Sequence, residues 1–374
     1  MEVVCTMKIS KIDVLPASLP MRLFTDAYAG YDRGEFALIK IETDEGFVGY
    51  GEAPSTVIVG FYGETLETVT RSLKSVLAPK LIGEDPLNIR RLTSIMDVAQ
   101  GNSFIAKTGV DIALYDLIGK ILKVPVHTLL GGKQRDKIPA CSEIGIVSSD
   151  KMAAEAMRLV ELGFRSIKIK AGADAEDEMK GVEKVREAVG EKVELRVDPN
   201  AGWSREETIK AIKTLLKCNV RYLEQPLPGW DLEGLSWVRK STGMQIMVDE
   251  SVWTPQDVVR VARADAADIV NIKITKTCGL KKGIEVYDTA TAHGLPCVIG
   301  TELESCMGLP AKLHIATALE KLPYACEFTE IAFQKLALEG QIRLDSEGMI
   351  DVPSGPGLGV SPDISLIEEH AVKY

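Results

Sequence analysis

Residues 166–199 decide the fold, and they read SIKIKAGADAEDEMKGVEKVREAVGEKVELRVDP. The short apolar stretches Ser166–Lys170 and Glu194–Asp198 are predicted to be strands. The charged segment between them places apolar residues at helical spacing, which predicts an amphipathic helix. Two strands joined by a helix run parallel when they share a sheet, so this stretch predicts a strand–helix–strand unit.

The same unit repeats along the chain with a period of about 25 residues. Amphipathic helices fill the intervals between the strands. Seven or eight such repeats predict an α/β fold built on a parallel barrel of the TIM type, with a doubly wound sheet as the alternative. The predicted strands are Ile138–Ile144, Ser166–Lys170, Glu194–Asp198, Tyr222–Glu224, Gln245–Asp249, Ile269–Lys273, Pro296–Gly300 and about Tyr324–Phe328.

The residues outside these repeats follow a different pattern. Three early strands and three helices predict an α+β unit at 1–132, before a barrel at 133–335. After Phe328 no convincing eighth helix follows, so the segment 336–374, with two short strands within 341–352, is predicted to return to the first unit. The early strands are Lys8–Val14, Phe36–Glu42 and Phe47–Ala53, and the helices are about Glu64–Leu77, Leu87–Val98 and Ala106–Ile121.

Composition excludes several classes of function. The 374 residues are 45% hydrophobic and 26% charged, which is typical of a folded globular protein. No apolar run approaches the roughly 18–20 residues that span a bilayer, and Met1–Lys8 lacks the layout of a signal peptide, so we expect a cytoplasmic protein without a membrane partner. The net charge of −10 disfavours nucleic acid. The seven cysteines are scattered and are predicted to be buried free thiols.

Charged residues end five consecutive strands of the predicted barrel. In a parallel barrel the reactive side chains lie at the carboxyl ends of the strands. Asp198, Glu224 and Asp249 follow one another at intervals of 26 and 25 residues, and Lys273 comes 24 residues later. Each therefore holds the same place in successive units, and all should meet at one rim.

Three carboxylates without His or Cys form an oxygen-only site that suits Mg²⁺ or Mn²⁺ better than Zn²⁺. Unpaired, they would repel one another and raise each other's pKa, so a bound cation explains the arrangement best. Acidic residues at strand ends can also cap the following helix. Three acidic residues at equivalent positions of successive strands, flanked by lysines, favour a metal site over helix capping.

The lysines supply acid and base groups. Lys168 and Lys170 project to the same face of their strand, and Lys273 lies four strands further round, on the opposite side of a bound substrate. Two neighbouring ammonium groups disfavour double protonation, so we expect one of them to be shifted toward the neutral form. Solvated strand-end charges are the alternative. With the metal, this set predicts removal of the proton next to a carboxylate.

These residues resemble the enolase superfamily, in its muconate-lactonizing subgroup of the mandelate racemase/muconate lactonizing enzyme family. The resemblance covers nearly the whole chain. It implies a (β/α)₇β barrel with an α+β capping domain made from the N-terminal region and the C-terminal tail. The motifs are Lys168-Ile169-Lys170, Asp198-Pro199-Asn200, Glu224-Gln225-Pro226, Asp249-Glu250-Ser251, Asn271-Ile272-Lys273, Gly49-Tyr50-Gly51-Glu52-Ala53-Pro54 and Ala113-Leu114-Tyr115-Asp116.

The resemblance implies a role for each site residue. Asp198, Glu224 and Asp249 would bind Mg²⁺ or Mn²⁺. Lys170 and Lys273 would be the acid/base pair, with Lys168 tuning Lys170, in the lysine-plus-Mg²⁺ arrangement known for the superfamily. The neighbouring Asn200 and Glu250 would support the ligands or the substrate. A small-molecule carboxylate would be the substrate, and the chain would form a homo-oligomer, often an octamer in this family.

Several reactions stay open. The leading hypothesis is an isomerase, a racemase or epimerase that acts on an amino-acid derivative or dipeptide through a metal-stabilised enolate. The stretch Gly51–Thr56 and Gly101-Asn102 are similar to dipeptide epimerases, but their Asp-x-Asp on the eighth strand is replaced by Glu327-Phe328-Thr329. A Glu there is typical of muconate-type cycloisomerases, the second reading. A dehydratase or an o-succinylbenzoate synthase-like lyase is the third.

Two expectations concern the substrate pocket. Glu143, Glu304 and Glu327, on the first, seventh and eighth strands, are predicted to receive a cationic end of the substrate. They could instead be paired with the lysines. The stretch Pro20–Gly34 is predicted to be a mobile loop that closes over the substrate, as the equivalent loop does in the family. The alternative is that its aromatic residues Phe24, Tyr28 and Tyr31 only pack against the barrel.

Overall fold

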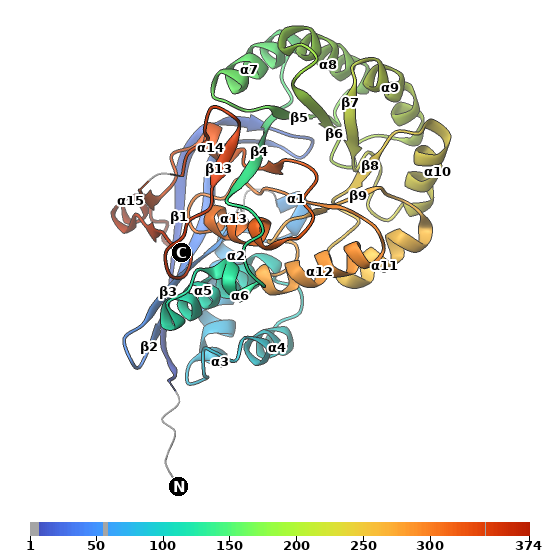
Figure 1. Cartoon of the computed structure of the whole chain (residues 1–374). Coiled ribbons are helices and arrows are strands. Elements are labelled where there is room, and N and C mark those ends of the chain that lie inside the picture. Colours follow the sequence, from blue (N-terminus) through green and yellow to red (C-terminus); the bar gives the residue numbers. More distant parts are fainter. Residues whose placement is uncertain (1–6, 55–58, 341) are drawn as a thin grey trace.

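The computed structural model describes residues 7–54, 59–340 and 342–374 and shows a parallel barrel beside a smaller α+β unit (Figure 1). The barrel strands pair in the order β10-β9-β8-β7-β6-β5-β4-β11, and β10 and β11 contact each other at the remaining seam. Their bounds are β4 Lys137–Ile144, β5 Ser166–Lys170, β6 Glu194–Asp198, β7 Val220–Glu224, β8 Ile246–Val248, β9 Ile269–Ile272, β10 Cys297–Ile299 and β11 Cys326–Glu327.

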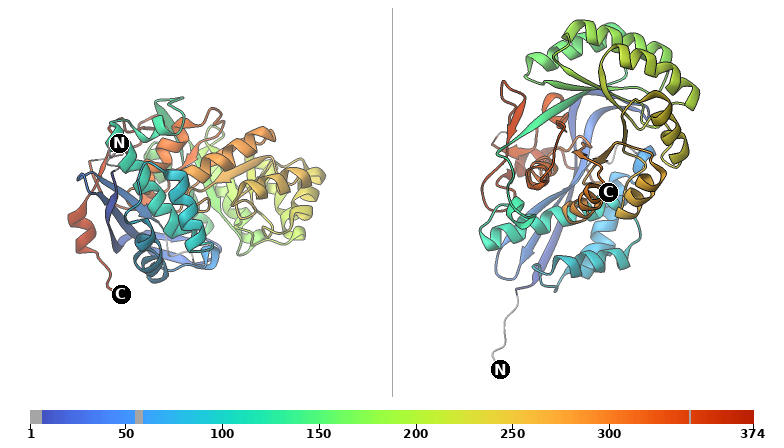
Figure 2. Two further views of the ribbon diagram at one scale, coloured as in Figure 1. Left: turned by 90° about the horizontal axis from the view of Figure 1, so that it is seen from below. Right: turned by 45° about the vertical axis from the view of Figure 1, so that its right-hand side comes forward.

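Seven helices connect these eight strands and cover the outside of the barrel (Figures 1 and 2). α11 buries one apolar stripe, with Val258 and Val261, whereas α13 is buried on all sides from Gly308 to Thr317. The predicted (β/α)₇β barrel is therefore confirmed, and the doubly wound sheet was the wrong alternative. The helices are α7 Ser149–Glu161, α8 Ala175–Val189, α9 Arg205–Lys217, α10 Leu232–Thr242, α11 Pro255–Ala264, α12 Leu280–Ala292 and α13 Gly308–Ala318.

The capping domain packs an antiparallel three-stranded sheet against helices. The strands are β1 (Ile9–Thr25), β2 (Gly30–Thr43) and β3 (Val48–Ala53), in that order. The helix α5 (Phe104–Leu122), buried from Ile105 to Gly119, lies against β3, and the two share a hydrophobic core with α2 and α4. The other helical segments of this domain are α1 Val59–Tyr62, α2 Leu66–Ser72, a π-helical turn at Leu73–Leu77, α3 Ala78–Leu81, α4 Ile89–Ala99 and α6 Val126–Leu129.

The C-terminal segment returns to the first unit. After α14 (Glu330–Phe333), β12 (Leu338–Glu339) pairs with β14 (Ser361–Pro362), and β13 (Met349–Asp351) pairs antiparallel with β4. Beyond α15 (Ile364–Glu369), the amide of Val372 donates to the carbonyl of Pro16 at 2.9 Å. Gln341, in the predicted short strands, lies outside the described residues. The exact domain boundaries at 132/133 and 335/336 stay a prediction.

The stretch 20–34 is not the loop that we predicted. Strand β1 runs on to Thr25 and β2 begins at Gly30, so most of it is a long hairpin with an irregular register near Pro20. The turn itself is only Asp26–Ala29, where the Asp26 carboxylate accepts hydrogen bonds from the amides of Tyr28 and Ala29. Phe24 and Tyr31 are buried and pack into the core. Aromatic side chains on a half-buried strand favour pairing over disorder.

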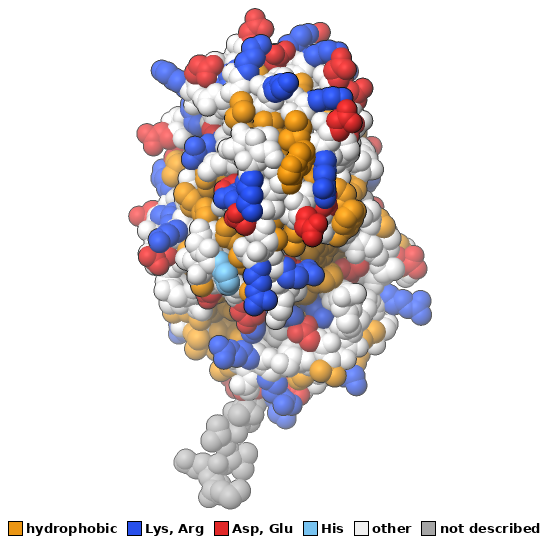
Figure 3. All heavy atoms as spheres, turned by 90° about the vertical axis from the view of Figure 1, so that its right-hand side faces the viewer, with side chains coloured by type: hydrophobic (Ala, Val, Ile, Leu, Met, Phe, Trp, Pro, Cys, Tyr) orange, Lys and Arg blue, Asp and Glu red, His pale blue; other side chains and the backbone are white. Residues whose placement is uncertain are grey.

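Side chains of both charges are interspersed on the face that Figure 3 shows, among scattered apolar residues. Within the described parts of the chain, no helix combines the length and the apolar character needed to cross a membrane.

The close approach of β3 to α5 gives a testable prediction. A Cβ built on Gly51 would lie 2.1 Å from the carbonyl oxygen of Gly109 and 2.5 Å from the amide nitrogen of Ala113. We expect Gly51→Ala to lower the free energy of unfolding by about 1–3 kcal/mol because backbone must move to admit the methyl group. Urea unfolding followed by circular dichroism measures this change. Gly101→Ala is the control, since its Cβ would meet no atom within 4 Å, and an equal effect of both would contradict the packing argument.

Candidate active site

The predicted site residues meet at the carboxyl ends of the barrel strands. Lys168 and Lys170 lie on β5, with Lys170 paired in register with Asp198 at the end of β6. Glu224 ends β7, while Asp249 and Lys273 directly follow β8 and β9. All six side chains are buried, each at most 6% exposed. The strand-end spacing therefore located this cluster correctly.

Lys168 is the centre of the cluster and is completely buried. Its Nζ lies 2.7 Å from Glu327, 2.8 Å from Glu143, 3.0 Å from Glu224 and 3.4 Å from Asp198. Although burial opposes ionisation, the charge of Lys168 lowers the pKa of Glu143 to about 2. One ammonium group thus holds together acids from four different strands.

Lys170 faces the cavity beside Asp198, with its Nζ 2.7 Å from the Asp198 carboxylate and 3.5 Å from Glu143. Burial favours the neutral amine, but the negative charges of Asp198 and Glu143 outweigh burial and raise the pKa of Lys170. Neighbouring carboxylates raise the pKa of Lys168 as well, so the expected shift of one of these two lysines toward the neutral form is wrong. Lys168 does lower the pKa of Lys170, as predicted, but it is the weaker influence.

Lys273 approaches from the other side of the barrel. Its Nζ lies 3.0 Å from Asp249 and 2.8 Å from Glu302, and burial, which lowers its pKa, is again outweighed by these two carboxylates. Lys276, three residues further on in the turn after β9 and fully buried, donates to the Asp249 carboxylate and, at 2.6 Å, to the Asp249 carbonyl. Lys276 was not predicted, because it lies in the turn after β9 and the prediction considered only residues at strand ends.

A cavity of about 20 Å³ lies between Lys170 and Lys273. This volume holds roughly one water molecule, so the structure is closed around its site. Tyr28 of the β1–β2 turn and Phe61 of α1 cover the cavity, and the Tyr28 hydroxyl donates to Glu250 at 3.2 Å. The lining residues are Phe24, Asp26, Tyr28, Phe61, Glu143, Lys170, Asn200, Lys273, Thr301, Glu302 and Leu303.

The carboxylates are spread around the lysines. Among the described residues, no three His, Cys, Asp or Glu side chains lie close enough together to hold a metal ion as they stand. The reason is that ammonium groups lie between the acids. Lys168 contacts both Asp198 and Glu224, and Lys273 and Lys276 both contact Asp249. A cation at Asp198, Glu224 and Asp249 would need these side chains to turn toward one another.

The charge balance of the cluster fits a divalent cation. With every carboxyl group ionised, six buried carboxylates would face four buried ammonium groups, a formal surplus of two negative charges. Burial and the charge of Asp198 raise the pKa of Glu224 well above its usual value, a sign of this surplus. The donors are oxygen atoms only, which suits Mg²⁺. The acids are Glu143, Asp198, Glu224, Asp249, Glu302 and Glu327, and the bases are Lys168, Lys170, Lys273 and Lys276.

The positions of the three acids predicted to line the substrate pocket, Glu143, Glu304 and Glu327, differ in part from the prediction. Glu143 lines the cavity and Glu327 contacts Lys168, so both belong to the cluster. Glu304 does not line the cavity, because its carboxylate lies 2.6 Å from the buried Lys312. Glu302 lines the cavity in its place. Glu304 was predicted to line the pocket, and Glu302 was not considered. Residues two apart share a face in a strand, but these two lie in the loop after β10, where Leu303 has a φ of 57° and their carboxylates contact different lysines.

The other predicted residues lie beside the metal-ligand candidates. The Asn200 amide donates to Asp198 at 2.9 Å, and the Asn200 side chain contacts Glu250 at 3.5 Å. Burial and the charge of Asp249 raise the pKa of Glu250 to about 8. Glu250 therefore lies within the electrostatic field of the site, although its side chain is turned toward Tyr28.

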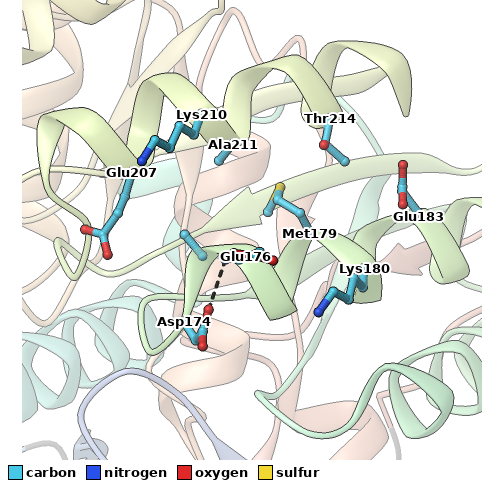
Figure 4. Close-up of a pocket in the computed structure, with 10 residues that line it drawn as sticks. Asp174, Glu176, Met179, Lys180, Glu183, Glu207, Lys210, Ala211 and Thr214 are labelled. Atoms are coloured by element: carbon cyan, nitrogen blue, oxygen red, sulfur yellow. Dashed lines mark hydrogen bonds between the residues drawn. The ribbon is translucent and has the colours of Figure 1, made fainter.

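A larger hollow lies elsewhere. It measures about 480 Å³ and lies on the outside of the barrel between α8 and α9 (Figure 4). Lys180, Lys210, Glu183 and Glu207 line it with Met179 and other side chains. None of the strand-end acids or lysines reaches this groove, so its size alone does not make it the active site.

The loop that carries Glu302 is tied to the capping domain by Glu52 of β3. This buried carboxylate accepts hydrogen bonds from the amides of Ser305, Cys306 and Gly308 at 2.7–2.8 Å. Burial raises the pKa of Glu52 to about 7, in spite of these three donors. The capping domain therefore helps to set the position of the β10–α13 loop over the barrel.

Comparison with known proteins agrees with the geometry. Residues 10–131 match the model of the mandelate racemase/muconate lactonizing enzyme N-terminal domain, and residues 151–366 match that of the enolase C-terminal domain-like family. The chain belongs to the mandelate racemase/muconate lactonizing enzyme family. The resemblance to the enolase superfamily is thus confirmed.

Members of this family that resemble the chain include several isomerases. The chain is 32% identical over 369 residues to an N-succinyl-L-Arg/Lys racemase of Bacillus cereus, covering 98% of both proteins, and the structure of that racemase superposes with a TM-score of 0.92. It is 34% identical over 334 residues to muconate cycloisomerase 1 of Rhodococcus opacus, covering 88% of this chain and 89% of that enzyme.

A solved dipeptide epimerase of Enterococcus faecalis, complexed with Mg and the dipeptide L-Leu-L-Tyr, is 30% identical with a TM-score of 0.89, over 95% of this chain and 99% of that one. These relatives confirm the prediction of an isomerase of the enolase superfamily. They also support Mg²⁺ as the metal of this group of enzymes.

The Glu52 contact predicts a pH dependence of stability. The folded protein binds a proton at Glu52 up to about pH 7, whereas an ordinary glutamate loses it near its usual pKa of 4.5. Between these values the folded state holds more protons, so raising the pH lowers the free energy of unfolding. We expect the wild type to lose stability relative to Glu52→Gln between about pH 5 and pH 8.

Thermal unfolding at several pH values measures this difference. The control is Glu187→Gln on the exposed face of α8, which should run parallel to the wild type throughout. A constant gap between the wild type and Glu52→Gln over this range would show that Glu52 ionises normally.

Proposed function

We propose that this protein catalyses a 1,1-proton transfer at the carbon next to a carboxylate, racemising or epimerising an amino-acid derivative or a dipeptide. The main observation that supports this proposal is that Lys170 and Lys273, four strands apart, line one cavity from two sides. A carbon held between two amines can lose its proton to one and receive a proton from the other, which inverts its configuration. The relatives that are named racemases and epimerases support this choice.

The residues have distinct parts in the proposed reaction. The substrate carboxylate points toward Asp198, Glu224 and Asp249, which would hold Mg²⁺ or Mn²⁺. A bound dication supplies Lewis-acid stabilisation of the charge that develops on that carboxylate. The neutral member of the lysine pair takes the α-proton, and the protonated member delivers a proton to the opposite face. Which lysine acts as the base depends on the configuration of the substrate.

The neighbouring side chains prepare these groups. Lys168 holds Glu143, Glu224 and Glu327 in place and adds positive charge beside Lys170. A cation on Asp198 and Asp249 would offset the negative charge that now raises the pKa of both catalytic lysines, and so favour the neutral amine that a base requires. The β1–β2 turn, with Tyr28, excludes water when it covers the cavity.

A cycloisomerase is the second candidate function. Glu327 ends β11, where dipeptide epimerases usually carry the first Asp of an Asp-x-Asp, and Thr329 replaces the second. The 34% identity to muconate cycloisomerase 1 also favours it. Against it stands the acidic lining of the cavity, since Asp26, Glu143 and Glu302 would repel a dicarboxylate. A dehydratase or other lyase is the third reading. The homo-oligomer and the cytoplasmic location stay predictions.

Deuterium exchange from solvent tests the proposed function. We expect the Mg²⁺-loaded protein in D₂O to place deuterium on the α-carbon of a reactive dipeptide or N-substituted amino acid, with inversion, because the delivered proton comes from a solvent-exchanged lysine. Mass spectrometry and polarimetry measure both events. A muconate lactone as the only product, or an unsaturated product, would replace the proposal by the second or the third reading.

Substitution of the two lysines tests their roles. We expect Lys170→Ala and Lys273→Ala each to slow inversion by a factor of at least about 10²–10⁴, because each removes the proton carrier on one face. Each variant should still exchange the α-proton of one configuration through the remaining lysine. Calorimetric titration with Mn²⁺ should show that both variants bind metal. Inversion that survives in both variants would refute the assignment.

A further inference from the structure

Glu302 carries an acceptor that the fold does not use. Its side chain is 2% exposed and lines the cavity between the two lysines. Its Oε1 atom accepts from the Tyr62 hydroxyl and lies 2.8 Å from the Nζ of Lys273, but its Oε2 atom has no hydrogen-bond partner among the described residues. A buried carboxylate oxygen without a partner is costly, so this atom is suited to a donor or cation that arrives with the substrate.

Phe61, which lines the same cavity, is the centre of a cluster of aromatic rings. The Phe61 ring lies 4.8 Å from Tyr62, 5.4 Å from Trp253 and 5.9 Å from Tyr28, measured between centroids. The Lys273 ammonium lies 5.1 Å from the centroid of Phe61 and contacts Glu302 at the same time. The structure therefore already holds one cation between an aromatic face and this carboxylate, which is the environment that recognises charged nitrogen.

The charges on the cavity lining favour a second cation. Three acids, Asp26, Glu143 and Glu302, line the cavity with two lysines, Lys170 and Lys273. Asn200, on the same lining, has a buried Oδ1 atom with no hydrogen-bond partner in the described part of the chain. The cavity lining thus offers negative charge and two acceptor atoms without partners, Oε2 of Glu302 and Oδ1 of Asn200.

We propose that Glu302 and Phe61 form a subsite for a positively charged nitrogen, and that the substrate is a carboxylate that carries such a nitrogen near its reacting carbon. This inference rests on the proposed function and names its substrate class. The nitrogen contacts the Oε2 atom of Glu302 and packs against the aromatic rings. An N-acylated amino acid without a cationic group, or a dicarboxylate, leaves the Oε2 atom of Glu302 without a partner and binds less tightly.

A pair of isosteric probes tests the subsite by binding alone. Trimethylglycine and 3,3-dimethylbutanoate have the same shape and the same carboxylate, and they differ in a positively charged nitrogen in place of a carbon. Calorimetric titration of the Mg²⁺-loaded protein should give an affinity for trimethylglycine at least about tenfold higher, since a carboxylate and an aromatic face both favour the cation.

Variants identify the residues responsible. Glu302→Gln should remove most of the tenfold preference while keeping the shape of the wall, and Phe61→Leu should reduce it in a protein whose buried charges are untouched. Glu304→Gln and Phe104→Leu are the matched controls. Glu304 faces Lys312, and Phe104 contacts Trp253 from outside the cavity lining, so both should keep the wild-type preference.

Equal or tighter binding of 3,3-dimethylbutanoate by the wild type would overturn the inference. A preference that persists in Glu302→Gln and in Phe61→Leu would overturn it as well. The cation subsite and the 1,1-proton transfer can be refuted independently, because the affinity of the probes is measured without turnover. A cation preference without α-proton exchange in any substrate refutes the 1,1-proton transfer only, and exchange without a cation preference refutes the subsite only.

Discussion

The site depends on one buried ammonium group. Lys168 is inaccessible to solvent and contacts carboxylates from β4, β6, β7 and β11. Burying a charge is costly unless it is paired, so each partner makes the burial of the others possible. Because the partners come from strands on different sides of the barrel, the ion pairs fix how the strand ends face one another. The cavity between Lys170 and Lys273 is a consequence of that arrangement.

The sequence predicted the parts of this arrangement that repeat. Asp198, Glu224 and Asp249 recur at one position of successive strand–helix units, and a parallel barrel brings equivalent positions to one rim. The same regularity predicted the barrel and placed Lys168 and Lys170 at the end of a barrel strand. The resemblance to the family then added roles for these residues, which neither spacing nor composition supplies.

What the sequence did not predict lies where regular alternation ends. Glu302 and Glu304 differ by two positions, and the left-handed backbone at Leu303 between them decides which one faces the cavity. Lys276 reaches Asp249 from a turn, so no strand pattern indicates it. The long β1–β2 hairpin was mistaken for a loop because its glycines and charges obscure the pairing. The lysine pKa depends on the sum of all neighbouring charges, which only coordinates provide.

The return of the C-terminal segment to β1 has a consequence for synthesis of the chain. The carbonyls of Pro16 and His370 and the amides of Val372 and Ser18 join the two ends, and β13 covers the start of β4. The edge of β1 therefore gains these neighbours only after residues 370–372 have left the ribosome. During translation the barrel strands emerge in order, whereas the edge of β1 stays open to solvent for most of that time. Such long-range closure slows folding, and it means that neither unit can be cut out as one continuous piece without exposing the other.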